Sequence, residues 1–329
     1  MKKLYTVILI LLALVMVFAV VYTRNTDVTK SDYALDTIIK VSVKGKDAKK
    51  SIDEIFEQIK KDDNLLSAYK ENSEVSSLNK EKSLSSDTET AKIISDSVIY
   101  SEKTNGYFDV TIKPLSDLWD IKNNTGYIPS DEETGNALKS VGYKNIKSEN
   151  GKVVLEGGAS VDLGGIAKGY CANKAIEILK TNNIKEAIID LGGNVYVFGN
   201  RNFKVGIQNP DGERGEYFGI CNVKNTSVVT SGAYERYFVK DGKMYHHILS
   251  PFTGKCTDSD LKSVTVVGED SQKCDAFSTA VFAMGKDEGI KVLKNEPDLM
   301  YIIVDSDNNV YNSKELDFEI TDKNFKLGQ

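Results

Sequence analysis

The sequence predicts a mixed α+β fold with a strand-rich core. Strand-like and helical patterns follow one another irregularly rather than as repeated βαβ units, and residues 194–268 are mostly short strand-like segments separated by Asn, Asp and Gly turns. The chain has 329 residues, of which 40% are apolar and 27% charged. These values allow one large domain or two modest ones with a buried core, and they exclude collagen-like, coiled-coil and largely disordered proteins.

The first segment has the pattern of a membrane-spanning helix. The run from Leu4 to Tyr22 is uncharged and follows two lysines, and it is long enough to cross a bilayer. We predict an uncleaved single-pass anchor. A cleaved secretory signal is the alternative, which the bulky neighbours of Ala19 disfavour. The two lysines favour a cytoplasmic N-terminus, so the rest of the chain is expected on the extracytoplasmic side of the cell membrane.

The predicted organisation is an anchor or signal segment at 1–24, a polar tether at 25–32 and one domain at 33–329. Apolar residues alternate in the expected strands and recur at helical spacing in the expected helices. The elements expected in order are a strand over 33–44, helices over 52–66 and 88–104, a strand over 159–164, a helix over 166–181, a strand over 186–190, helices over 275–284 and 286–294, and a hairpin turning at 307–309.

Charge and cysteine usage limit the possible partners. The net charge is −6, so the chain lacks the basic surface that binds a nucleic-acid backbone, and an anionic ligand must be held by local devices. The four cysteines are far apart with no CxxC pair, which argues against a zinc ribbon or a thioredoxin-type site. We expect buried thiols.

A glycine turn predicts a candidate phosphate site. In VDLGGIAKGY, Gly164 and Gly165 precede a helix whose first turn contains Lys168. Glycines allow close backbone approach, and a helix N-terminus with a lysine suits a phosphate. A tight strand-to-helix turn explains the glycines about as well. The tetrapeptide DLGG occurs again at 190–193, on the other side of the same helix.

Four further side chains are candidates for chemistry. Asp275 and Thr279 are four residues apart on a predicted helix, so a carboxylate and a hydroxyl share a face that would suit Mg²⁺. An acid that only interacts with the helix dipole is the alternative. His246 and His247 are adjacent on a predicted strand, so they point to opposite faces, and at most one can serve a given pocket as a general base.

Seven segments, taken in order, resemble the FAD:protein FMN transferases, the ApbE-like family. They are AYKENSEVSSLN, GYFDVTIKPL, VDLGGIAKGY, the second DLGGN, TSGAYERYF, HHILSPFTG and CDAFSTA. The resemblance implies a flavin transferase domain over 33–329, with a smaller appended lobe and an FAD cleft between the lobe and the strand-rich core. The first strand departs from the family, which often has Met-Gly-Thr, with the methionine touching flavin, where Leu35, Asp36 and Thr37 stand here.

The resemblance also implies the site residues. Tyr69 would stack on the isoalloxazine ring, and His247, next to a flavin neighbour, is our candidate for the base. Residues lining the flavin cleft or contacting FAD would be Asp109, Val110, Thr111, Asp162, Lys168 and Ile248. The Mg²⁺ ligands would be Asp275, Thr279 and a main-chain carbonyl of the glycine turn, Gly165.

The reaction implied is Mg²⁺-dependent transfer of FMN from FAD to a Ser or Thr hydroxyl of a partner protein, with release of AMP. The acceptor would be a flavin-carrying subunit of a membrane redox complex or a surface electron-transfer protein. Two alternatives stay open: an FAD pyrophosphatase that forms FMN and AMP with water as acceptor, and a non-catalytic flavin-binding surface protein.

Overall fold

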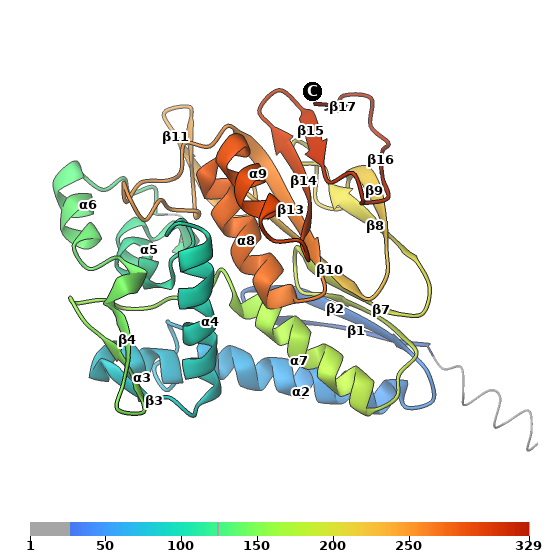
Figure 1. Cartoon of the computed structure of the whole chain (residues 1–329), viewed down its shortest axis with the longest axis horizontal. Helices are drawn as coiled ribbons and strands as arrows, with labels where there is room; N and C mark the ends of the chain where they lie inside the picture. The colour runs from blue at the N-terminus through green and yellow to red at the C-terminus, as the bar shows by residue number, and fades with distance from the viewer. Residues whose placement is uncertain (1–26, 124, 329) are drawn as a thin grey trace, which may run out of the picture.

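The computed structural model describes residues 27–123 and 125–328. Its centre is a nine-stranded sheet (Figure 1). Neighbouring strands are antiparallel except for the last pair, which is parallel. The strands, in spatial order, are β1 (Asp27–Ala34), β2 (Thr37–Lys44), β6 (Glu186–Asp190), β7 (Asn194–Gly199), β10 (Thr226–Gly232), β13 (Leu261–Gly268), β14 (Met300–Asp305), β15 (Asn309–Asn312) and β17 (Lys326–Leu327).

Helices cover one face of this sheet and a small sheet covers the other. The helices are α2 (Ala48–Leu66), α7 (Ala167–Thr181), α8 (Ser271–Met284) and α9 (Lys286–Lys294). The small sheet consists of β16 (Phe318–Ile320), β9 (Tyr217–Val223) and β8 (Phe203–Gln208). Phe203, Ile207 and Phe218 of the small sheet pack with Val228 and Ile302 of the large one. The predicted α+β class is confirmed.

A smaller group of elements lies beside the end of the sheet, on the left in Figure 1. Part of it packs around Leu115, Trp119, Ile121, Phe238 and Leu249, and the rest shares the apolar core of α2 and α7. The elements are α3 (Glu74–Glu81), α4 (Glu89–Lys103), α5 (Lys113–Trp119), α6 (Asp131–Leu138), the three-stranded sheet of β3 (Ser83–Ser85), β5 (Lys152–Leu155) and β4 (Ile146–Glu149), and the hairpin of β11 (Tyr237–Lys240) and β12 (Lys243–His246). Single 3₁₀ turns link them at Val110–Ile112, Ile121–Asn123 and Tyr143–Asn145.

The N-terminal strand differs from the prediction. The strand expected over 33–44 is a hairpin, with Ala34 opposite Thr37 and Asp27 opposite Lys44. Residues 27–32, predicted as part of the tether, therefore belong to β1. The turn residues Leu35 and Asp36 have φ values of 53° and 58°. The sequence pattern missed this turn because Asn-Gly or Asp-Gly is the usual pair there, not Leu-Asp.

Two other predicted boundaries are wrong. Residues 159–164 form no strand; the Val161 N–H and C=O are bonded to the Asn79 side-chain amide at 2.6 and 2.8 Å instead of to a neighbouring strand. Helix α8 begins at Ser271 rather than at 275, because the Asp270 carboxylate caps it by accepting the N–H groups of Gln272 and Lys273. The helices expected over 52–66, 88–104, 166–181 and 286–294 and the final hairpin are confirmed within a few residues.

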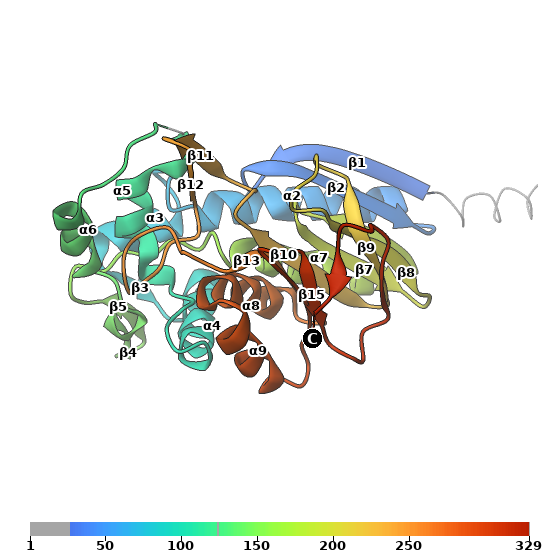
Figure 2. The same ribbon diagram turned by 90° about the horizontal axis from the view of Figure 1, so that it is seen from above.

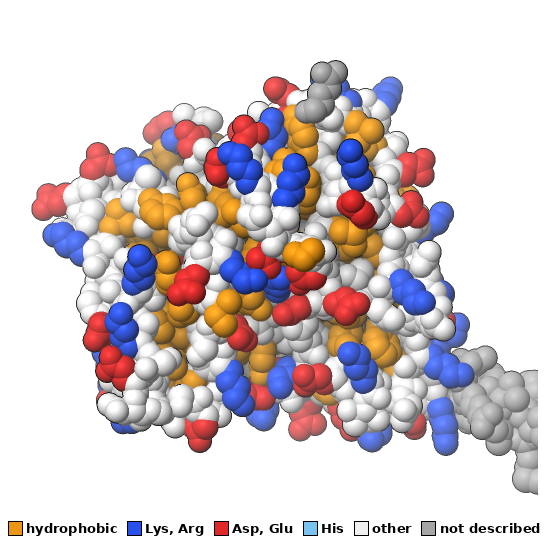
Figure 3. Space-filling model, in the orientation of Figure 1, with side chains coloured by type: hydrophobic (Ala, Val, Ile, Leu, Met, Phe, Trp, Pro, Cys, Tyr) orange, Lys and Arg blue, Asp and Glu red, His pale blue; other side chains and the backbone are white. Residues whose placement is uncertain are grey.

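Cysteine and surface predictions are also tested. All four cysteines are free thiols, with Cys171, Cys221 and Cys274 buried and Cys256 half-buried. On the face in Figure 3, acidic and basic side chains are interspersed, with no broad basic patch. Within 27–123 and 125–328, no helix is long and apolar enough to cross a membrane. The predicted span at 4–22 lies outside these residues.

Candidate active site

A cleft of about 600 Å³ lies between the large sheet and the smaller group of elements. Its walls come from the β1–β2 turn, the glycine turn before α7, the cleft-facing side of α8, and the segment that follows β12. All but one of the residues predicted from the sequence line it; the exception is Thr111. Segments from much of the chain thus converge on one concave surface.

The glycine turn places the start of α7 at the cleft. The Asp162 carboxylate accepts the Gly164 N–H at 2.9 Å, which fixes the turn. Ile166 precedes α7 and provides no side-chain cap, although the Ala167 and Gly169 N–H groups donate to the Leu163 carbonyl and the Asp275 carboxylate. The positive end of the helix dipole lies beside the cleft. The Lys168 ammonium reaches the Gly192 carbonyl of the second DLGG turn at 3.3 Å. The two DLGG turns therefore meet at one site.

Asp275 is positioned by a close crossing of α7 and α8. A Cβ added to Gly169 would lie 2.3 Å from the Ser271 carbonyl oxygen, so only glycine permits this approach. The crossing lets the Gly169 N–H donate to the Asp275 carboxylate at 2.9 Å. Asp275 is 3% exposed. Burial raises the pKa of its carboxyl group, and the nearby Lys168 opposes that shift.

The donor groups around Asp275 fit a Mg²⁺ ion. Thr279 lies one turn further along α8 and also faces the cleft. A Cβ on Gly165 would lie 3.6 Å from the Thr279 hydroxyl oxygen, so the glycine turn passes beside it. A carboxylate, a hydroxyl and a peptide carbonyl form the hard oxygen set that Mg²⁺ prefers alongside water and phosphate oxygens. No cluster of three or more His, Cys, Asp and Glu occurs among the described residues, and this predicted set contains only one acid.

Tyr69 presents its ring to the cleft. Its hydroxyl donates to the Asp162 carboxylate at 2.9 Å, and the residue is 52% exposed. Enclosure of the hydroxyl and the Asp162 charge both raise the pKa of Tyr69. The ammonium groups of Lys113 and Lys122 lie 4.4 and 5.4 Å from the ring centroid. The ring is thus available for stacking on a planar ligand, provided that a lysine moves aside.

The three residues predicted at 109–111 have different environments. Asp109 and Val110 line the cleft, but Thr111 is fully buried behind its wall, so the prediction that Thr111 lines the cleft is wrong. The Asp109 carboxylate accepts the Thr111 N–H and hydroxyl and the Tyr143 N–H. Burial raises the pKa of Asp109. Asp109 and Thr111 therefore brace the loop that carries Val110.

The histidine pair points in opposite directions, as predicted. His246 is buried and donates to the Thr257 carbonyl at 3.1 Å, whereas His247 faces the cleft. The Nδ1 of His247 lies 3.3 Å from the Arg236 carbonyl oxygen. Because that oxygen only accepts, Nδ1 carries the proton and Nε2 keeps its lone pair. The surrounding groups and the charge of Arg236 lower the pKa of His247, although its side chain stays exposed in the cleft, so its ring is neutral at pH 7.

Ile248 follows His247 and presents its buried side chain to the cleft. Its carbonyl oxygen already accepts the Thr257 N–H and hydroxyl, so contact with a ligand would come from the side chain. Sequence reasoning missed Asp36, Lys122, Arg214 and Arg236, which also line the cleft. Arg236 stands within the TSGAYERYF segment and Asp36 within the stretch where the family often has Met-Gly-Thr; Lys122 and Arg214 carry no motif, and only the topology brings them to the site.

Comparison with known proteins supports the family resemblance that the seven ordered segments indicate. The model of the ApbE family matches residues 35–303. A protein of Treponema pallidum named FAD:protein FMN transferase is 27% identical over 311 residues, covering 86% of each chain. One of the same name from Klebsiella pneumoniae is 32% identical over 256 residues, covering 76% of this chain and 80% of its own.

A solved structure supports the same assignment. The crystal structure of the ApbE protein of Thermotoga maritima superposes with a TM-score of 0.81 at 34% identity, covering 88% of this chain and 97% of that one. The family model extends from the turn between β1 and β2 to β14 and so includes every residue predicted for the site. The chain therefore belongs to the ApbE family.

Proposed function

We propose that this enzyme transfers FMN from FAD to a Ser or Thr hydroxyl of a partner protein and releases AMP. The observation that carries the proposal is the meeting of Asp275, Thr279 and Lys168 at the start of α7 within one cleft. A pyrophosphate requires this combination of oxygen ligands and positive potential. The relatives named FAD:protein FMN transferase support the choice of substrate.

We assign the metal to Asp275, Thr279 and the Gly165 carbonyl. When bound, Mg²⁺ would supply Lewis-acid polarisation of phosphate oxygens. The Gly169 N–H holds the Asp275 carboxylate in place at 2.9 Å. Lys168 and the first N–H groups of α7 would neutralise further phosphate charge, which explains how a protein of net charge −6 binds an anionic dinucleotide.

The transfer step requires a base and a nucleophile in line. The acceptor oxygen forms a bond to the FMN phosphorus while the anhydride bond to AMP breaks, and AMP leaves with the bridging oxygen. We assign removal of the hydroxyl proton to Nε2 of His247, because a neutral imidazole is the form that accepts a proton. Negative phosphates beside His247 would raise its pKa above the value of the free site.

The flavin half is assigned to the wall formed by Tyr69, Asp162, Val110 and Ile248. Tyr69 offers an exposed ring, and its bond to Asp162 connects that ring to the glycine turn. A flavin stacked on Tyr69 would therefore have its phosphate near the start of α7. Val110 and Ile248 add an apolar surface to the same cleft.

We further propose that the enzyme works on the outer side of the cell membrane, held by a helix over 4–22. The uncharged run and the two lysines before it support this placement. The acceptor would then be a flavin-carrying subunit of a membrane redox complex or a surface electron-transfer protein.

The test is to incubate the purified protein with FAD, Mg²⁺ and a candidate acceptor domain. We expect AMP release that requires the acceptor, together with a fluorescent acceptor band on a denaturing gel. A chelator or the Asp275→Ala substitution should abolish both signals. Arg201→Lys is a matched control, because Arg201 pairs with Glu186 and does not line the cleft. Rapid AMP release without an acceptor would instead indicate hydrolysis, and FAD binding without AMP would indicate a binding protein.

A further inference from the structure

Arginine is rare in this protein and concentrated at the cleft. The sequence contains four arginines, Arg24, Arg201, Arg214 and Arg236. Of the three that the structure describes, Arg214 and Arg236 line the cleft. The other, Arg201, bonds to Glu186 at 3.0 Å and stacks on Phe203. A protein that uses lysine for nearly every other positive charge thus places arginine at this wall.

Arg236 comes from the loop between β10 and β11. Its backbone carbonyl accepts the His247 N–H at 3.1 Å, which fixes the base of the β11–β12 hairpin. Its guanidinium donates to the Asp36 carbonyl in the β1–β2 turn at 3.5 Å. Both hairpins lie along the same edge of the molecule in Figure 2. Arg236 therefore bridges the two hairpins at the cleft, beside the candidate base.

Arg214 reaches the cleft from another layer. It lies in the loop between β8 and β9, and a bond of 2.8 Å from the Asn209 N–H to the Glu216 carbonyl closes this loop. The Gly215 N–H and the Glu213 carbonyl are both bonded to the Gln208 side chain. The backbone on both sides of Arg214 is thus held, while its side chain faces the cleft.

Neither arginine has an acidic partner in the described part of the chain. The 15 ion pairs found there include Arg201 but not Arg214 or Arg236. A guanidinium presents a planar fork of donors that matches two oxygens of a phosphate, which a lysine ammonium cannot reproduce. Two guanidinium groups that line one cleft without an acidic partner indicate an anion subsite.

This subsite is built from other elements than the one at α7. Tyr69 bonds to Asp162 at the start of the glycine turn, so the flavin wall and the α7 phosphate site are contiguous. Arg236 instead is joined to the β1–β2 turn through the Asp36 carbonyl, and Arg214 comes from the β8–β9 loop. A dinucleotide whose flavin lies at Tyr69 would direct its other half toward the arginines.

We propose that Arg214 and Arg236 bind the phosphate of the AMP half of FAD and stabilise the charge that forms on it as AMP leaves. This inference rests on the proposed function. Breaking the anhydride leaves an additional negative charge on the AMP phosphate, so donors already aimed at that group favour the transition state. The same contacts would hold AMP as a product after transfer.

The experiment measures AMP and FMN binding separately, by calorimetric titration of each into the protein with Mg²⁺. The variants are Arg214→Lys, Arg236→Lys and the double substitution, with Arg201→Lys as the matched control. Lysine keeps the charge and removes the fork. We expect AMP affinity to fall by about 10- to 100-fold in the double variant, because bonds to charged groups are lost. FMN affinity and the control should change by less than about twofold.

Each outcome decides a different question. Loss of AMP binding with FMN binding retained supports the subsite. Equal loss of both nucleotides, or no loss of either, overturns it even if the wild-type enzyme transfers FMN. If the arginine variants lose AMP but the wild-type protein releases no AMP from FAD with any acceptor or with water, the subsite stands as a nucleotide site and the proposed function fails. Alanine at both positions provides a second test, since it should weaken AMP binding further than lysine.

Discussion

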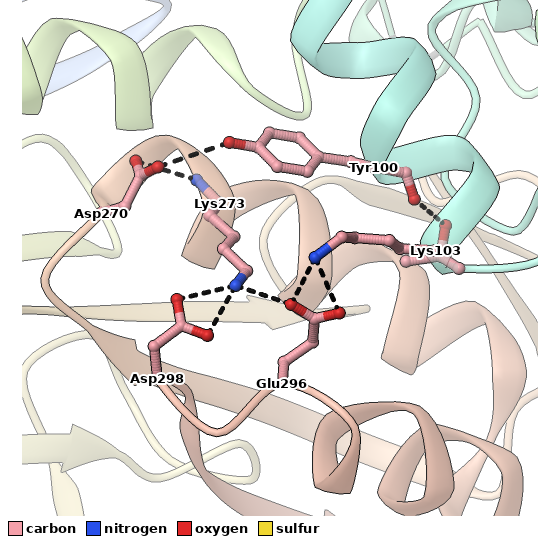
Figure 4. Close-up of polar contacts among 7 residues, drawn as sticks. Tyr100, Lys103, Asp270, Lys273, Glu296 and Asp298 are labelled. Carbon is pink, nitrogen blue, oxygen red and sulfur yellow. Dashed lines mark hydrogen bonds and ion pairs between the residues drawn. The ribbon is translucent and has the colours of Figure 1, made fainter.

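Helix α8 has two charged regions that differ in how their charges are compensated. In its first turn, the Lys273 ammonium contacts the carboxylates of Asp298 and Glu296 at 2.7 Å, and Lys103 of α4 contacts Glu296 at 2.8 Å (Figure 4). Lys273 and Glu296 are each 8% exposed. This network ties α8 to α4 and to the loop before β14, and every charge in it has an opposite partner.

One turn later, the cleft face of α8 shows the opposite arrangement. Asp275 is buried with a single N–H partner, and it forms no ion pair in the described part of the chain. Lys168, Arg214 and Arg236 also line the cleft without an acidic partner there. The charges that tie α8 to its neighbours are therefore compensated within the protein, whereas these four cleft charges are left for a ligand.

The largest expected effect comes from Asp275→Asn. We expect AMP release from FAD to fall at least about 100-fold, because an amide is a poor Mg²⁺ ligand. The free protein should become more stable at pH 7, since burial raises the pKa of Asp275 and its ionised form opposes folding. Enzyme assays and thermal unfolding without ligand check the two effects. A less stable variant would show that Asp275 belongs with the structural charges.

Lys273→Met should have the opposite effects: lower stability with little change in activity. Removing this ammonium leaves Glu296 and Asp298 without one of their partners, and breaking such a buried pair costs about 3 kcal/mol. We expect a lower unfolding temperature, but AMP release per folded molecule that stays close to wild type below that temperature. Lys291→Met is the matched control, because the Lys291–Glu288 pair is exposed. A large loss of activity in the folded variant would show that the network also positions Asp275.

The fold class and much of the site could be predicted from the sequence for physical reasons. The apolar periodicity predicts α2 and α7 because each helix buries an apolar face. The prediction that Asp275 and Thr279 share one face holds because their spacing depends on a single helix. The β1–β2 turn could not be predicted, since Leu35 and Asp36 adopt a conformation that their residue types disfavour and that pairing along the strands enforces.

Contacts of the site between distant parts of the chain also could not be predicted from the sequence. Arg214 reaches the cleft only because the small sheet packs on the large one, and Lys122 meets Asp36 from a distant part of the chain at 2.6 Å. Thr111 was misplaced because its neighbour Val110 faces the cleft, while Thr111 turns inward to bond to Asp109. Local pattern identifies a segment, and packing decides which of its side chains reach the ligand.

Asp62 on α2 is a buried charge outside the cleft that lacks an ionic partner. It is fully buried; one carboxylate oxygen accepts from Gln58 at 2.8 Å, and the other has no partner among the described residues. Burial raises its pKa to about 6. Below pH 3.8 both states are protonated; between about pH 4 and 6 the unfolded state ionises first, so stability falls as pH rises.

Asp62→Asn should therefore remove a pH dependence of stability. We expect a gain of up to about 3 kcal/mol at pH 8 and little change at pH 4, measured by urea unfolding across this range. Asp63→Asn is the matched control, because Asp63 lies next to Asp62 on the same helix and pairs with Lys70 at the surface. A slope that persists in Asp62→Asn would assign it to another group.

The smallest effect is expected for Asp36→Gly, at the mouth of the cleft. Asp36 pairs with Lys122, and the two side chains are 42% and 47% exposed, so the pair contributes at most about 1 kcal/mol. Glycine would relieve the strain of a φ of 58° but would also make the unfolded chain more flexible. These terms nearly cancel, so we expect the free energy of unfolding to change by less than about 0.5 kcal/mol. Lys122→Gln should show a similarly small change, and a double-mutant cycle measures the coupling. A coupling well above about 1 kcal/mol would place this pair with the Lys273 network, as a charge pair that holds the fold.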